Sequence, residues 1–384
     1  MTTSLRIALV GNLANVAYQT CKFLRAKGVE ADVYIGATEL AHQTSNPNNL
    51  EPEIMSDPPE WIKIVPERRL GLVSRVIRFL GGPSFSYVSN RKLLMTMREY
   101  DIIESFACQP LFVRNVGRPY ISYATGSDLR ELALEDSALG KHVRGIFRHA
   151  SHVYFNPDRG HVEAVKKLQL VNASPYHQII DTNFFAPTSR HENKSKLTIF
   201  HPTALDWTED RILSRWMKGN DRLFLAFAKF VEEGNEARLI YLERGRDVQP
   251  TRELVKKLGI EENVQSLKGD LTAEQLREFY NRADIVADQF DIGIGLIALE
   301  AMSCARPVVV NAGESMQLYD PPPPVADCCT ELQIYNRLKL LRDAEYRQQL
   351  GNAAREYATQ YHDGMRIADS LIAKCNEILR TGPS

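Results

Sequence analysis

The most informative stretch of the sequence reads Asp288-Gln-Phe-Asp-Ile-Gly-Ile-Gly-Leu-Ile-Ala-Leu-Glu-Ala-Met-Ser-Cys-Ala-Arg-Pro-Val-Val-Val310. We expect a strand to end near Ala287, a Gly-x-Gly turn to follow at Gly293 and Gly295, and a helix to begin at about Leu296. The apolar run that ends at Val310 predicts the next strand. Alternation of strands and helices is typical of a parallel sheet that carries helices on both faces.

The same alternation opens the chain. An apolar run over residues 5–10 predicts a first strand, Gly11 and Asn12 a turn, and the pattern up to Gly28 a helix that precedes a second strand at 31–35. A polar stretch at 186–196 interrupts this pattern, and the alternation then restarts. The candidate strands of this second half are residues 197–200, 238–242, 285–287 and 307–310.

These patterns predict two doubly wound, Rossmann-like α/β domains facing a central cleft, the arrangement known as GT-B, with helices at the C-terminal end. A chain of 384 residues is too long for one ordinary core and long enough for two such domains. We expect an acceptor-side domain over 1–190 and a nucleotide-sugar donor domain over 191–355. A helical tail over 356–384 follows, and packing back on the first domain is one arrangement open to it.

Composition narrows the class of protein. Hydrophobic residues make up 44% of the chain, charged residues 25%, and the net charge is −1. A near-neutral chain argues against a nucleic-acid binder, which normally carries a basic excess. None of the six cysteines forms a CxxC pair, so reduced thiols in the cytoplasm fit best. No run approaches the roughly 18 apolar residues of a membrane span, so we expect a cytoplasmic protein or one peripheral to the inner membrane face.

The Gly-x-Gly turn has a chemical interpretation. Glycines at the start of a helix let backbone N–H groups and the positive helix end approach a phosphate closely. Glu300 follows about one turn into the helix that begins at Leu296, where its carboxylate could accept hydrogen bonds from both hydroxyls of a ribose. The alternative interpretation is a tight turn followed by a surface glutamate, because a Gly-x-Gly pair alone is a weak signal.

This stretch resembles the donor-binding signature of glycosyltransferase family four, in which a Gly-x-Gly precedes Glu-Ala-Met and an x-Pro-Val strand. The resemblance implies that Glu300 binds the nucleotide ribose. The family places a second glutamate, which contacts the donor sugar, at the position that Ile292 occupies here. Asp291 or Asp288 is expected to supply that carboxylate. The pair formed by Asp288 and the glutamine after it also resembles a bacterial subgroup of the family.

A second element of the resemblance is Lys218-Gly-Asn-Asp221, similar to the Lys-Gly-x-Asp element whose lysine grips the donor diphosphate. Outside this family, a lysine before a glycine is more often a solvated helix start. The family usually pairs this lysine with an arginine, and Arg215 and Arg244 are the two candidates.

The first half carries three further matches. The loop of Gly11 and Asn12 corresponds to one that touches diphosphate or acceptor in related enzymes, although a plain turn is an equal alternative. Gly126-Ser-Asp-Leu-Arg130 resembles an element that faces the cleft, in which Asp128 is a candidate catalytic residue or a helix N-cap. The segment 180–185 resembles the Asp-x-x-x-Phe element that closes the first domain.

The resemblance implies a retaining glycosyltransferase that moves a sugar from a nucleoside-diphosphate sugar, with UDP as the first choice, to a glycan, lipid-linked or small-molecule acceptor. It implies no metal and no cofactor, because cations and backbone meet the phosphate charge. Two alternatives stay open, a GT-B-related nucleotide-sugar epimerase and a non-catalytic nucleotide-sugar-binding module.

A basic segment generates a first prediction. Between Trp61 and Tyr100, eight basic residues stand against two acidic ones, and residues 68–80 predict an amphipathic helix with arginines beside its apolar face. A surface helix packed on its own sheet and a basic cleft for a phosphorylated acceptor are the alternatives. We expect weak, salt-sensitive binding to anionic vesicles, measured by co-sedimentation at low salt. Equal sedimentation with neutral vesicles would exclude membrane binding and favour a soluble acceptor.

Overall fold

The computed structural model describes residues 5–40, 51, 54, 56–66, 91–106, 113–188, 196–208, 217–291 and 293–382. The chain forms two compact units, of which unit 1 contains Met1–Ile179 and Gly364–Ser384 and unit 2 contains Ile180–Asp363. Each unit is built on a parallel sheet, which confirms the two doubly wound α/β domains predicted from the sequence. The basic stretch 68–80 lies outside the described residues.

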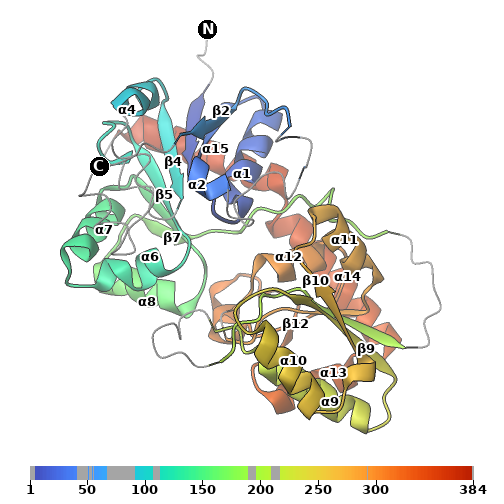
Figure 1. Cartoon of the computed structure of the whole chain (residues 1–384). Helices are drawn as coiled ribbons and strands as arrows, with labels where there is room; N and C mark the ends of the chain where they lie inside the picture. Colours follow the sequence, from blue (N-terminus) through green and yellow to red (C-terminus); the bar gives the residue numbers. More distant parts are fainter. Residues whose placement is uncertain are drawn as a thin grey trace. The chain divides into compact units, whose positions relative to one another are not determined.

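Unit 1 is a sheet of seven parallel strands within the described residues, in the order β3-β2-β1-β4-β5-β6-β7 (Figure 1). Its strands are β1 (Arg6–Val10), β2 (Glu30–Gly36), β3 (Ile62–Val65), β4 (Ile102–Phe106), β5 (Tyr120–Ala124), β6 (His152–Phe155) and β7 (Ala173–Pro175). Its helices are η1 (Leu13–Asn15), α1 (Val16–Ala26), α2 (Ala37–Leu40), α4 (Arg91–Met97), α6 (Ser127–Arg130), η5 (Leu132–Leu134), α7 (Ala138–His149), α8 (Arg159–Leu168) and α15 (Gly364–Thr381).

The first strand shows why helices cover both faces of this sheet. Successive side chains of a strand point to opposite faces. Ile7 and Leu9 therefore join a core with α1 and α15, while Ala8 and Val10 join a second core with α7. A strand that is apolar at every position is the pattern of a sheet buried on both sides.

Helix α15 brings the end of the chain back to unit 1, where it packs against α1 (Figure 1). Its buried residues recur at helical spacing, and they lie in one core with the buried face of α1. They are Ala368, Leu371, Cys375 and Ile378. The helix begins at Gly364, where an added Cβ would lie 2.2 Å from the ring of Phe23, so a glycine permits this close approach.

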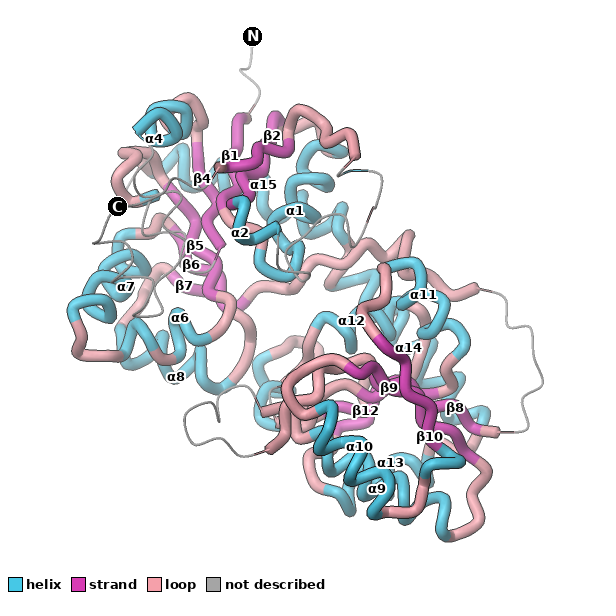
Figure 2. Tube along the Cα trace, viewed as in Figure 1, coloured by secondary structure: helices cyan, strands magenta, loops and turns pink. Residues whose placement is uncertain are grey.

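Unit 2 contains six parallel strands within its described residues, in the order β10-β9-β8-β11-β12-β13 (Figure 2). They are β8 (Leu197–His201), β9 (Ala237–Glu243), β10 (Val264–Lys268), β11 (Ile285–Ala287), β12 (Val308–Val310) and β13 (Ala326–Asp327). The helices are α9 (Asn220–Glu232), α10 (Val248–Lys257), η7 (Glu261–Asn263), α11 (Ala273–Arg282), α12 (Leu296–Ser303), η8 (Gly313–Leu318), α13 (Glu331–Leu340) and α14 (Ala344–Tyr361).

The strand order of unit 2 fixes where a ligand can bind. Chain order reverses between β8 and β11, which are neighbours in the sheet. In open parallel sheets, ligands bind outside the carboxyl ends of the strands at such a reversal.

Among the described helices, none has both the length and the apolar character needed to cross a bilayer.

Glu104 in unit 1 generates a prediction about stability. Its side chain is fully buried on β4, and its nearest partners are the hydroxyl of Tyr123 at 3.4 Å and the thiol of Cys375 at 3.9 Å. Burial raises the pKa of the Glu104 carboxyl to about 8, from an ordinary value of 4.5. The stability that this group contributes is therefore complete below pH 4.5 and is lost as the pH rises towards 8.

We expect Glu104→Gln to abolish this pH dependence. At pH 9 the variant should be more stable than the unmodified protein by roughly 2–4 kcal/mol, because no carboxylate has to ionise in the core. Near pH 5 the two proteins should be about equally stable. Urea unfolding at both pH values measures the difference, and an unchanged gap between pH 5 and pH 9 would contradict the assignment of Glu104.

Candidate functional site

The candidate site lies in unit 2, at the carboxyl ends of β8 and β11. The loop after β8 leads to Lys218, and the segment after β11 begins with Asp288 and Gln289. These strands are neighbours at the reversal of strand order, so residues about 70 positions apart in the sequence come into contact.

Lys218 and Gln289 join the two loops directly. The Lys218 ammonium donates a hydrogen bond to Oε1 of Gln289 at 2.6 Å, and Nε2 of Gln289 donates to the carbonyl of Gly293 at 2.8 Å. The backbone N–H of Phe290 also donates to the carbonyl of Lys218 at 2.7 Å. The Lys-Gly turn and the Gly-x-Gly turn therefore form one hydrogen-bonded assembly.

The Gly-x-Gly turn depends on its glycines. Gly293 has φ +61°, a left-handed conformation that favours glycine. The N–H of Gly295 donates to Oδ2 of Asp288 at 3.2 Å, and an added Cβ at position 295 would lie 3.0 Å from that oxygen. Helix α12 begins at Leu296, as the sequence predicts.

Asp288 is a buried anchor of this turn. Its Oδ1 accepts a hydrogen bond from the Thr203 hydroxyl at 2.8 Å, so the carboxylate links the loop after β8 to the start of α12. Burial raises the pKa of Asp288, although the Thr203 hydroxyl, the Lys218 charge and the Gly295 N–H oppose that rise. The structure therefore directs this side chain to Thr203 and to the helix start.

Glu300 lies on α12 and is partly exposed. Its Oε2 accepts a hydrogen bond from the hydroxyl of Tyr280 at 2.8 Å. Burial raises the pKa of the Glu300 carboxyl to about 7, while the Tyr280 hydroxyl lowers it, the Asp288 charge raises it and the Arg244 charge lowers it. A carboxylate with a single protein donor keeps acceptor capacity for a ligand.

Near the site lies one arginine that was not among the sequence candidates. Arg222, which the sequence did not single out, pairs with Asp291 at 2.7 Å and donates to the carbonyls of Phe290 and Cys329. The Asp291 carboxylate is therefore held by an arginine of α9. Arg244 lies 3.6 Å from Asp270, and its Nε is buried without a hydrogen-bond partner in the described part of the chain.

Arg215, a candidate partner of Lys218, and Ile292, which stands where the family places a glutamate, lie outside the described residues. Arg222 could have been noticed because it directly follows the Lys-Gly-Asn-Asp element. Its role there depends on the position of Asp291, which the sequence alone does not give.

The buried side chains of His201 and Asn220 connect the strands beside the Lys-Gly turn to the start of α9. One ring nitrogen of His201, Nδ1, hydrogen-bonds the carbonyl of Ala287 at 2.9 Å, and Nε2 contacts Nδ2 of Asn220 at 2.9 Å. Oδ1 of Asn220 accepts from the N–H of Asp206 at 3.0 Å. Burial lowers the pKa of His201 to about 4, so the imidazole is neutral and serves as a fixed hydrogen-bonding bridge between β8, β11 and α9.

The predicted residues of unit 1 follow strand ends and are hydrogen-bonded to backbone groups of unit 1. Gly11 has φ +85° and its N–H donates to the carbonyl of Tyr34. Asn12 is fully buried and accepts from the N–H of Tyr18 at 2.8 Å, which caps the first turn of α1. Asp128, after β5, accepts from the N–H groups of Gly126 and Leu129 at 2.9 Å.

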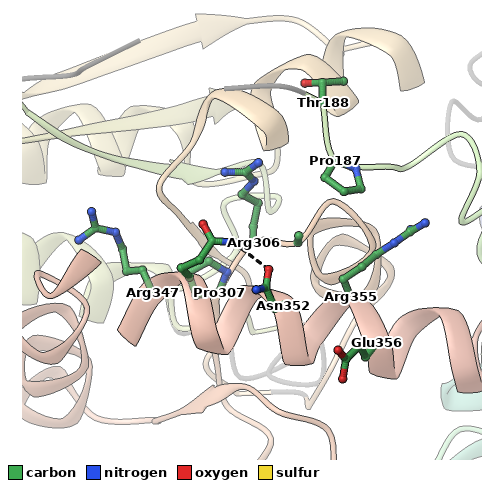
Figure 3. Close-up of a pocket in the computed structure, with 10 residues that line it drawn as sticks. Pro187, Thr188, Arg306, Pro307, Arg347, Asn352, Arg355 and Glu356 are labelled. Carbon is green, nitrogen blue, oxygen red and sulfur yellow. Dashed lines mark hydrogen bonds between the residues drawn. The ribbon is translucent and has the colours of Figure 1, made fainter. Parts of the chain in front are cut away.

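A cavity of about 410 Å³ lies next to Ala305–Pro307, which precede the amino end of β12. Three arginines contribute to its lining, yet Figure 3 shows their guanidinium groups pointing in different directions. Arg355 instead donates to the carbonyls of Thr182, Phe185 and Ser303. This arrangement ties the segment 182–185 to α14 and does not form a convergent anion site.

Comparison with known proteins gives the family of this site. Residues 213–318 match the family model described as glycosyl transferases group 1, a range that contains Lys218, the Gly-x-Gly turn and Glu300. No curated protein matches the sequence.

Solved structures share the fold over nearly the whole chain. A crystal structure of Anabaena HepE in complex with UDP has a TM-score of 0.66 and 16% identity, covering 97% of this chain and 100% of that one. A sucrose-phosphate synthase from Thermosynechococcus elongatus has a TM-score of 0.74 and 15% identity, covering 98% and 100%. A putative UDP-N-acetylglucosamine 2-epimerase from Listeria monocytogenes has a TM-score of 0.60 and 14% identity, covering 97% and 95%.

These likenesses give the fold, and the family model gives the chemistry class. Residues 213–318 form a group 1 glycosyltransferase domain, and the chain is a glycosyltransferase of GT-B-like fold.

Proposed function

We propose that the protein transfers a sugar from a UDP-sugar to an acceptor hydroxyl with retention of the anomeric configuration. The observation that carries this proposal is the hydrogen-bonded assembly of Lys218, Gln289 and Gly293 at the reversal of strand order in unit 2, beside the start of α12, the helix that carries Glu300. One ammonium, one glycine turn and one carboxylate are what a diphosphate and a ribose require.

In this proposal the ribose and the diphosphate of the nucleotide sugar are bound by different parts of the site. Glu300 accepts hydrogen bonds from the ribose hydroxyls, while Lys218 and the start of α12 face the diphosphate. During transfer, the bond between the anomeric carbon and the β-phosphate oxygen breaks, and the acceptor oxygen bonds to that carbon. The departing phosphate takes the acceptor proton. Lys218 stabilises the negative charge that grows on the phosphate, and such electrostatic stabilisation is often the largest catalytic contribution.

The choice of UDP has support from a protein of similar fold, since HepE is described in complex with UDP. The acceptor is proposed to be a glycan, a lipid-linked glycan or a small molecule bound by unit 1, on the cytoplasmic side of the membrane. Asp288 and Asp291 are held by Thr203 and Arg222. Of these two candidates for the missing sugar-contacting carboxylate, Asp291 is the more exposed, and we keep it as the proposed contact.

A nucleotide-sugar epimerase is the second candidate, because a putative epimerase shares the fold. The family match over 213–318 favours transfer. One assay discriminates the two functions and tests the proposal. The protein is incubated with UDP-glucose, UDP-galactose or UDP-N-acetylglucosamine, with and without simple acceptors, and released UDP and epimerised donor are both measured. Release of UDP without epimerisation supports transfer, epimerised donor supports the epimerase, and binding without either product indicates a binding module.

The ribose assignment predicts the effect of Glu300→Gln. The amide carries no charge, so its hydrogen bonds to two ribose hydroxyls should be weaker, and UDP binding should lose about 1.5–3 kcal/mol. Isothermal titration calorimetry with UDP measures the change. Glu233→Gln is the matched control, since Glu233 also accepts a hydrogen bond from a tyrosine, Tyr335, at the far end of α9. Unchanged UDP affinity in the folded Glu300→Gln variant would contradict the ribose assignment.

The leaving-group assignment predicts the effect of Lys218→Ala. Removing this ammonium should lower kcat roughly 10²–10³-fold, because the lost charge opposes one that develops in the transition state. The exposed Lys256→Ala on α10 serves as the control and should leave kcat unchanged. Activity should also survive excess EDTA. If chelation abolished turnover and magnesium or manganese restored it, a metal rather than Lys218 would be the main counter-charge.

A further inference from the structure

The hydrogen bond between Tyr280 and Glu300 joins two helices that flank the site. Tyr280 lies on α11 and Glu300 on α12, and the hydroxyl donates to Oε2 at 2.8 Å. Glu300 has no other hydrogen-bond partner in the part of the chain that the structure describes. The hydroxyl therefore determines which way this carboxylate is turned.

Packing fixes the position of this hydroxyl. The side chain of Tyr280 is fully buried, and its ring lies against the rings of Phe200 on β8 and Phe185, with centroid distances of 5.9 and 6.1 Å. A ring held on several sides has few alternative rotamers, so its oxygen is presented to Glu300 at little further entropic cost.

The acceptor capacity of Glu300 remains sufficient for a diol. An ionised carboxylate has about four lone-pair sites, of which Tyr280 occupies one. A pair of neighbouring hydroxyls needs two. The orientation that Tyr280 imposes therefore leaves Oε1, and part of Oε2, for a ligand.

We propose that Tyr280 is a positioning residue that orients the Glu300 carboxylate and keeps it ionised for binding the nucleotide ribose. This inference rests on the proposed function, because it assumes that Glu300 is the ribose acceptor. Tyr280 acts through Glu300 and touches neither the nucleotide nor the sugar.

The charges around Glu300 explain why a hydroxyl donor matters here. Burial and the nearby Asp288 both raise the pKa of Glu300, and among the charged or titratable groups facing it, Tyr280 and Arg244 lower that pKa. Cys304, one turn further along α12, also faces this carboxylate, and its own pKa lies at about 12. With the pKa of Glu300 at about 7, removal of the tyrosine hydroxyl should move the pKa upward, so more of the carboxyl is protonated at neutral pH.

The test is Tyr280→Phe, which removes the hydroxyl and keeps the ring. UDP affinity is measured by calorimetry from pH 6 to pH 9 for the unmodified protein, Tyr280→Phe, Glu300→Gln and the double variant. Glu300→Gln has no carboxyl at this position, so its pH profile reports the titration of UDP and of the other groups alone. Thermal unfolding of each variant verifies the fold.

We expect Tyr280→Phe to weaken UDP binding roughly 3–20-fold at pH 7, because a larger fraction of the Glu300 carboxyl is protonated and its orientation is no longer fixed. The deficit should shrink towards pH 9, because the higher pH restores the carboxylate. In the Glu300→Gln background, Tyr280→Phe should change the affinity less than twofold. Tyr335→Phe removes another tyrosine–glutamate hydrogen bond in unit 2, from the buried Tyr335 to the exposed Glu233, and should leave UDP binding unchanged at every pH.

The outcomes separate this inference from the proposed function. If Glu300→Gln weakens UDP binding but Tyr280→Phe does not, the positioning role is wrong and the ribose assignment stands. If Tyr280→Phe weakens binding equally at all pH values, or equally in the Glu300→Gln background, its effect is a general packing defect and the inference is overturned. If Glu300→Gln itself leaves the affinity unchanged, the ribose assignment fails, and the inference fails with it.

Discussion

The buried carboxylate of Asp288 is the contact on which the site in unit 2 depends. Its Oδ1 accepts a hydrogen bond from the Thr203 hydroxyl after β8, and its Oδ2 accepts one from the Gly295 N–H before α12. The carboxylate therefore joins the two loops that follow the neighbouring strands β8 and β11. It acts together with the Lys218–Gln289 hydrogen bond, which joins the same two loops. The Asp288 charge also has an electrostatic effect at a distance, because it raises the pKa of Glu300 on α12.

The backbone of this region could be predicted from the sequence, and the reason is local. The left-handed conformation at Gly293, with φ +61°, and the start of a helix at Leu296 are both indicated by the residue types at and next to these positions. The partners of the carboxylates could not be predicted in this way. Asp288 binds a threonine 85 positions away, and Asp291 binds Arg222. Which of two neighbouring carboxylates is held, and by what, depends on the strand order, and no local pattern encodes that order.

The fold shows the same division between local and distant information. Largely apolar runs at residues 5–10 and 197–200 predicted strands correctly, because a strand buried on both faces is apolar at nearly every position. Glu104 breaks that pattern on β4, yet the strand forms around it. Its environment includes Cys375, 271 residues away on α15. The return of α15 to unit 1 therefore contributes to the burial of the Glu104 carboxyl, and this burial raises its pKa.

Glu104 and Glu300 carry the same chemical group, and burial raises the pKa of both, but only Glu300 has a strong donor. Glu104 faces a hydroxyl at 3.4 Å, whereas Glu300 receives one at 2.8 Å and remains partly exposed. Burial without good donors favours the neutral acid, and a short hydrogen bond at a partly open position favours the anion. Burial raises the pKa at both positions, to about 8 at Glu104 and to about 7 at Glu300, where the Tyr280 hydroxyl and the Arg244 charge oppose the rise. A carboxylate that must accept ligand hydroxyls near neutral pH therefore needs a donor of its own, and in this fold the neighbouring helix α11 supplies one.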